Sequence, residues 1–152
     1  MIHAVLLGLH LLAAAVWVGG MAAMHFAVRP AAVATLPPPQ RLPFMAAAIG
    51  RFLDLVGIAI VVLLASAVAL IALGNGFASL RWSVHAMTAI GLAMVAIYGH
   101  IRLAPYRRLA RAVNEGQWPA AVAALDLVRR LVMLNLGLGT LVFVLAVVGP
   151  AL

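Results

Sequence analysis

Four histidines and two prolines of this chain form a motif that occurs twice. The motif is H-x14-H-x4-P, and it comprises His10, His25 and Pro30 and then, 75 residues later, His85, His100 and Pro105. Imidazole is a common metal ligand in proteins. Both copies lie in apolar stretches long enough to cross a bilayer, where an ionisable side chain is costly and usually functional. The repeated histidines therefore predict metal ligation inside a membrane.

The composition defines an integral membrane protein and restricts the kinds of metal site. The chain is 67% hydrophobic and 9% charged, with a mean hydropathy of +1.20 over 152 residues, too apolar for a soluble domain. Its net charge of +7 comes entirely from arginines at the ends of apolar segments, as orientation signals are placed, so no nucleic-acid partner is expected. The absence of cysteine excludes disulfides, thiolate copper sites, iron–sulfur clusters and covalently attached c-type haem.

Four apolar segments predict a single all-α domain over residues 1–152, a four-helix bundle in the lipid bilayer. The predicted spans are about 4–28, 52–73, 84–103 and 131–148. We expect the first span to be retained, because it is too long for a signal-peptide core and lacks basic residues before it. Nine arginines follow spans 1 and 3 and only Arg81 follows span 2. The positive-inside rule then places both termini and the Gly74-Asn75-Gly76 turn outside the cytoplasm.

The 75-residue offset predicts two tandem helical hairpins related by a pseudo-two-fold axis along the membrane normal. Prolines at 37–39 and 119 favour helix starts before spans 2 and 4. Surface ion pairs are expected between Arg51 and Asp54 and between Asp126 and Arg130.

The two carrier helices run in the same direction, so the histidines form two pairs at two depths. His10 and His85 belong to the outer level, and His25 and His100 to the inner level. Fifteen residues separate the levels by roughly 22 Å, with an angular offset of about 60°. Facing imidazoles at one level are what a six-coordinate haem iron requires, so two b-type haems are predicted. The spacing is a residue or two longer than in the respiratory b-type cytochromes that it resembles, and Gly19, Gly20 and Gly91 are candidate places for a helix defect that absorbs the excess.

Arginines near the histidines are candidate contacts for haem propionates. Arg29 and Arg102 follow the inner histidines, and Arg81 precedes the outer one of the second copy. Two haems would carry electrons across the bilayer, with a quinone or another redox partner near the arginine-rich face or near Trp17 and Trp82. No hydrolytic or other catalytic residue set is found, so an electron-transfer or oxidoreductase role is expected ahead of hydrolase or transferase activity. A homo-oligomer is compatible with the sequence.

A family resemblance adds copper to the candidates. The segment HLLAAAVWVGGM from His10 to Met21, with later stretches such as WSVHAM from Trp82 and YGH from Tyr98, resembles the CopD superfamily of bacterial membrane proteins. The resemblance implies a multi-pass protein of the bacterial inner membrane and a role in copper resistance or uptake. The superfamily is related to HemJ, a haem-binding oxidase of protoporphyrinogen, so the resemblance does not choose between the metals.

The residues offer copper ligands of their own. Met21, Met24 and His25, together with Met87 and Met94 on the third span, supply thioether and imidazole donors of the type that selects Cu(I). Methionine is also an ordinary filler of apolar helices. The N-terminal Met1-Ile2-His3 can form a square-planar Cu(II) site. The paired geometry of the histidines favours a di-haem cytochrome, with a CopD-like copper protein as the alternative and a HemJ-like haem oxidase as the third hypothesis.

Overall fold

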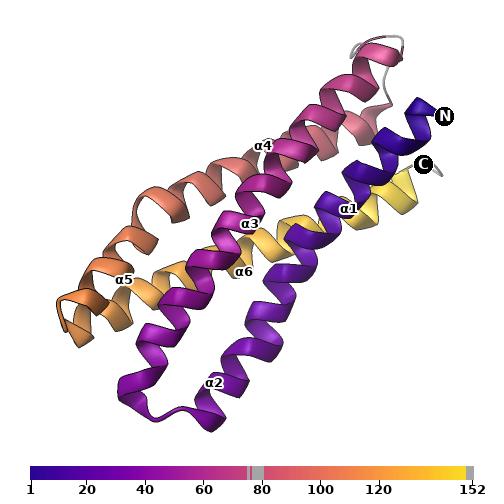
Figure 1. Cartoon of the computed structure of the whole chain (residues 1–152). Coiled ribbons are helices and arrows are strands. Elements are labelled where there is room, and N and C mark those ends of the chain that lie inside the picture. Colours follow the sequence, from indigo (N-terminus) through magenta and orange to yellow (C-terminus); the bar gives the residue numbers. More distant parts are fainter. Residues whose placement is uncertain (75, 77–80, 150–152) are drawn as a thin grey trace.

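Four long helices build the protein, as the computed structural model shows (Figure 1). The structure describes residues 1–74, 76 and 81–149. Its elements are α1 (Ile2–Ala23), the π-helix η1 (Met24–Val28), α2 (Arg29–Thr35), α3 (Pro38–Leu73), α4 (Trp82–Leu103), α5 (Pro105–Asn114) and α6 (Trp118–Val148). The predicted all-α four-helix bundle is confirmed, and every long helix is apolar enough to span a membrane.

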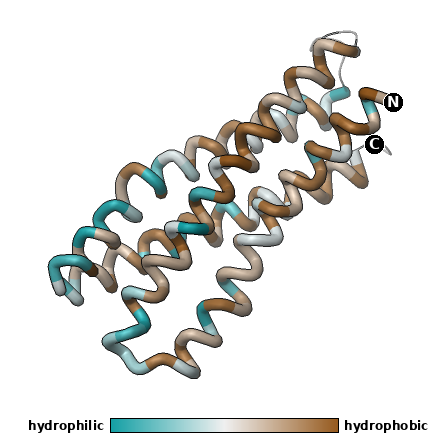
Figure 2. Tube along the Cα trace, in the orientation of Figure 1, coloured by the Kyte–Doolittle hydropathy of each residue, from teal (hydrophilic) through white to brown (hydrophobic). Residues whose placement is uncertain are grey.

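The outer surface of the bundle is apolar over most of its length. Val61, Val68, Leu92 and Val147 are examples of large side chains that are more than half exposed, which suits contact with lipid. Polar residues concentrate at the end of the bundle opposite the start of α1 and the end of α6, which lie at the same end (Figure 2). Helix α3 ends and α4 begins at this same end of the bundle; of the turn expected between them, Asn75 lies outside the described residues.

The proline of each repeat marks a break in helical hydrogen bonding. In the first copy α1 passes into η1 before Pro30, and the Arg29 N–H bonds to the Met24 carbonyl, five residues back. In the second copy α4 ends at Leu103, and Ala104 leaves helical geometry just before Pro105 opens α5. Proline lacks an N–H and clashes with the preceding turn, which explains both breaks. The defect thus lies at the inner histidine, not at Gly19, Gly20 or Gly91.

Helices α3 and α6 begin at prolines, as expected, and extend beyond the predicted spans. Pro38 and Pro119 occupy the first turns, where the missing N–H costs nothing. With 36 residues, α3 is about 54 Å long, whereas the hydrocarbon core of a bilayer is about 30 Å thick. At the arginine-rich end these extensions pack with α5 around a cluster that includes Ile49, Leu109, Ala121 and Val128.

Within each half of the chain the spanning helices pack closely as hairpins. Helix α1 packs mainly on α3, and α4 with α5 packs on α6. The halves meet near the middle of the bundle, where the rings of Trp17 and Tyr98 make an edge contact at 6.4 Å between centroids. Tyr98 also donates a hydrogen bond of 2.9 Å to the Leu53 carbonyl. Helices α1 and α4, which carry the repeated histidines, therefore face each other across the bundle.

The prediction of two ion pairs, Arg51 with Asp54 and Asp126 with Arg130, is wrong, because both aspartates pair with other arginines. Asp54 of α3 pairs with Arg102 of α4 at 2.5 Å, not with Arg51. Asp126 pairs with Arg129 at 2.7 Å, not with Arg130. The first pair joins the two halves, because the inter-helix approach at the Tyr98 contact brings Arg102 within reach of α3. Spacing along one helix could not reveal that approach.

Candidate functional site

A large cavity lies between the spanning helices in the half of the bundle that contains the termini. Its volume is about 460 Å³, and all four long helices contribute to its wall. Such a volume is within the range of roughly 300–1,000 Å³ that is usual for small-molecule and cofactor sites. Its lining is mainly apolar, and the side chains that could bind a metal or a polar group are those of His3, His10, Met87, Thr88 and Met94.

His10 is held in this outer cavity by a hydrogen bond to α3. Its Nδ1 lies 2.9 Å from Ser66 Oγ. Ser66 Oγ donates its single proton toward the backbone carbonyls of its own helix, at 2.7 Å from Val62 O and 3.0 Å from Leu63 O. When the hydroxyl proton goes to one of these carbonyls, Ser66 accepts from the N–H at His10 Nδ1, and in that tautomer Nε2 carries the lone pair that a metal ion requires. A metal-binding histidine is commonly oriented by such a partner.

Ser66 is the part of this site that the sequence did not reveal as such. It is 3% exposed in the described structure and lies 56 positions from His10. The sequence feature that could have identified Ser66 is that few hydroxyl side chains occur within the apolar spans. Its partner depends on the register between α1 and α3, which hydropathy does not specify.

The second copy of the motif is placed differently from the first. His85 is half-buried and is flanked by the cavity-lining Val84 and Met87, yet it does not itself line the outer cavity. His100 is exposed, and it lies on a different face of α4 from the buried Met94 and Ile101, about 100–120° around the helix axis. Pairing of His10 with His85 and of His25 with His100 stays a prediction.

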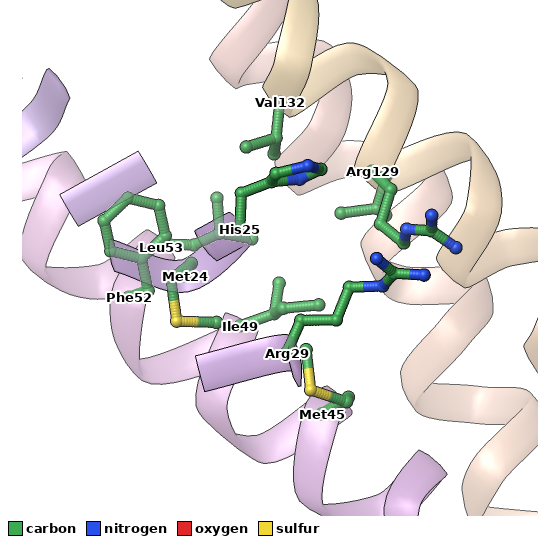
Figure 3. Close-up of a pocket in the computed structure, with 10 residues that line it drawn as sticks. Met24, His25, Arg29, Met45, Ile49, Phe52, Leu53, Arg129 and Val132 are labelled. Carbon is green, nitrogen blue, oxygen red and sulfur yellow. The ribbon is translucent and has the colours of Figure 1, made fainter. Parts of the chain in front are cut away.

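His25 lines a second, smaller pocket at the arginine-rich end. This inner pocket holds about 40 Å³ and includes Met24, Arg29, Met45 and Arg129 (Figure 3). It unites His25 with Arg29, two residues predicted to act together on an inner haem. The enclosed space, however, is far below the range of cofactor sites. In the described conformation the inner pocket therefore has no room for a macrocycle.

Packed side chains separate the outer cavity from the inner pocket. Trp17, Met21, Val56 and Met94 form a buried cluster, with exposures of 0–5%, between the two. Met94 also reaches the wall of the outer cavity. Met21 and Met24, predicted as ligands of one copper ion with His25, belong respectively to this central cluster and to the inner pocket.

The other predicted residues lie apart from the two pockets. Arg102 is engaged by Asp54 and stacks over the Tyr106 ring at 5.6 Å. Arg81 precedes α4 at the terminal end, the same end as the outer cavity. His3 is exposed at the cavity mouth. Among the described residues, no group of three or more His, Cys, Asp or Glu side chains could hold a metal ion, so a metal site here would need methionine or backbone ligands.

The four apolar helices define a multi-pass membrane protein, and His3 and His10 line a cavity within its bundle. The chain matches the family described as "Copper resistance protein D" over residues 46–149, and it belongs to this CopD family. The match includes His85, His100, Met87 and Met94, whereas His10 precedes it. Neither the curated proteins nor the solved structures contain a significant match to the chain.

Proposed function

We propose that the protein handles copper, with the outer cavity as the binding site for a Cu(I) ion that is cargo. The observation that carries this proposal is the position of the His10 imidazole, which lines the cavity and is held there by the contact of its Nδ1 with Ser66 Oγ. Met87 and Met94 line the same cavity. Imidazole and thioether are donors that suit Cu(I). Membership of the CopD family supports the same metal.

The setting of the outer cavity favours a monovalent soft cation over a hard one. No carboxylate belongs to its described lining, and carboxylate oxygens are the ligands that Ca²⁺ and Mg²⁺ require. Its walls are contributed mainly by Leu, Val and Ala. Transfer of a divalent ion into such surroundings without charged ligands would be very costly. The exposed His3 at the mouth would serve as the first contact for an incoming ion.

Haem is the second candidate, and the volume of the outer cavity is the observation that favours it. A space of about 460 Å³ with apolar walls is larger than one metal ion needs. His10 would supply an axial ligand, and His85 would become its partner if α4 rotated toward the cavity. A bound haem would supply one-electron chemistry. Under this hypothesis the chain is a b-type cytochrome or a HemJ-like oxidase, and the inner haem on His25 and His100 would require the helices around the inner pocket to separate.

Binding experiments on the purified protein in lipid nanodiscs distinguish the two functions. We expect a colourless protein that binds one Cu(I) ion in competition with a chromogenic chelator. His10→Ala should weaken Cu(I) binding roughly tenfold or more, and Ser66→Ala by about tenfold, because loss of an orienting partner typically has that effect. His100→Ala is the matched control and should retain affinity. A red protein with a reduced b-type spectrum that His10→Ala abolishes would establish haem; equal Cu(I) affinity in wild type and His10→Ala would exclude the proposed site.

A further inference from the structure

The inner pocket brings two guanidinium groups together beside an apolar groove. Arg29 extends from α2 and Arg129 from α6, and their side chains point toward each other at one end of the pocket, with His25 nearby (Figure 3). These residues lie 100 positions apart in the sequence. Two cations that converge in this way repel each other, and the ion pair of Arg129 with Asp126 offsets only one of the two charges. The pocket therefore has the electrostatic character of an anion site.

The hydrogen-bonding capacity of both arginines is incompletely used. Among the described residues the ion pairs are Arg102–Asp54 and Arg129–Asp126, and Arg29 has no hydrogen bond or ion pair in that part of the chain. Arg129 uses Nη1 for Asp126, but its Nε is buried without a partner. A buried donor without an acceptor costs about 1–3 kcal/mol. An additional acceptor group would satisfy both side chains.

The remaining lining shows what kind of anion suits the pocket. Besides His25 and the two arginines, the lining consists of apolar side chains, those of Met24, Met45, Ile49, Phe52, Leu53, Val128 and Val132. A free inorganic anion would leave this surface uncovered. An amphiphile satisfies both parts, with a phosphate at the guanidiniums and an acyl chain along the apolar wall. The enclosed 40 Å³ has room for phosphate oxygens, while the rest of such a molecule would lie outside.

The position of the pocket along the bundle matches the headgroup layer. Arg29 opens α2, and Arg129 lies 11 residues after the start of α6. Both therefore belong to the half of the bundle where polar residues concentrate (Figure 2) and where α3 and α6 continue beyond the hydrophobic length of a bilayer. Basic pockets between transmembrane helices at this level are known to bind anionic lipid headgroups. We propose that the inner pocket binds the phosphate of one anionic phospholipid through Arg29 and Arg129. This site is separate from the outer cavity and does not rest on copper handling.

Native mass spectrometry of the protein released from defined lipid tests this proposal. In mixed phosphatidylglycerol and phosphatidylcholine, wild type should retain one phosphatidylglycerol, and Arg29→Gln with Arg129→Gln should lose it, with an apparent affinity at least about tenfold lower. Arg107→Gln with Arg108→Gln is the matched control, since it removes the same charge from the exposed face of α5. Inorganic phosphate added to the protein should not displace the bound phosphatidylglycerol. It should also not bind saturably to protein that is prepared in phosphatidylcholine alone.

Each alternative result has a defined meaning. Equal loss of lipid in the pocket pair and the α5 pair would overturn the proposal and indicate general attraction to the arginine-rich surface. Saturable binding of inorganic phosphate that competes with the lipid would replace it with a free-anion site. Arg29→Lys keeps the charge and should keep the lipid at reduced affinity, which excludes unfolding as the cause of loss. Cu(I) binding at the outer cavity should be unchanged in every variant of this set.

Discussion

At the scale of single residues, equal histidines in the sequence have unequal surroundings in the structure. His10 is oriented by Ser66 at 2.9 Å inside a cavity. His25 lies on a π-helix beside two arginines, and His100 is exposed on α4. A ligand must be both available and positioned. On that criterion His10 is the strongest candidate ligand of the four.

Asn135 provides a stability prediction at the same scale. It is 2% exposed, its Nδ2 donates weakly to the Met94 carbonyl at 3.4 Å, and its Oδ1 has no donor among the described residues. Since an unsatisfied buried acceptor costs about 1–3 kcal/mol and a hydrogen bond within the membrane is worth about 0.6 kcal/mol, Asn135→Leu should raise stability by about 1 kcal/mol. Thermal unfolding in detergent should show a midpoint higher by about 2–4 °C.

The control for this variant is Thr140→Val on the same helix. Thr140 is exposed and bonds back to the Leu136 carbonyl at 2.9 Å, so its replacement should leave the midpoint unchanged. A clear loss of stability in Asn135→Leu alone would mean that Oδ1 accepts a hydrogen bond from an internal water or a ligand.

At the scale of elements, the repeated proline explains where the helices are irregular. Pro30 follows a π-helix and Pro105 follows the end of α4, so one sequence feature produces two different local structures. In the first copy the helix continues to Thr35, and around Pro30 its N–H groups bond to carbonyls five residues back where a regular α-helix uses four. In the second the chain turns into α5, whose buried Leu109 and Ala112 pack on α6.

Replacement of Pro30 by alanine should convert η1 into regular α-helix, because the restored N–H can bond four residues back. Rewinding the wide turn would rotate α2, with Arg29 at its start, relative to α1 by up to about 100° and so change the lining of the inner pocket. Hydrogen–deuterium exchange should show slower exchange of the amides between residues 26 and 31. Pro119→Ala, at a helix start, should change exchange very little. Unaltered exchange in Pro30→Ala would show that η1 is imposed by packing against α3.

Hydropathy and proline placement were sufficient to predict the four helices and the proline-marked starts of α3 and α6. They were insufficient for the site, because it depends on how helices rotate about their axes. The lateral approach of Tyr98 to Leu53 and Gly57 determines which face of α4 meets the cavity. The face of α4 that lines the cavity includes Met87 and Met94 and does not include His100. Nothing in the apolar pattern of α4 distinguishes these faces, since lipid and cavity both accept apolar side chains.

At the scale of the whole molecule, the distribution of arginines predicts the orientation in the membrane. The arginine-rich end should face the cytoplasm and both termini the outside. The chain has no cysteine, so single cysteines can be introduced without background. In intact cells a membrane-impermeant maleimide should label Ile2→Cys and leave Gln40→Cys unlabelled; in permeabilised cells both should react. Labelling of Gln40→Cys alone in intact cells would reverse the orientation.

The buried cluster around Trp17, Tyr98 and Met94 has an electrical consequence. This cluster closes the outer cavity from below, and a cation bound at His10 lies above it, at most about 12 Å along α1 from the start of that helix. It would cross less than half of a hydrocarbon layer about 30 Å thick. Full transfer of one charge is worth about 2.3 kcal/mol per 100 mV. The binding free energy of a cation in the outer cavity should therefore change with membrane voltage by less than half of that amount. Under the proposed function, the affinity of the protein for Cu(I) would thus depend only weakly on the membrane potential.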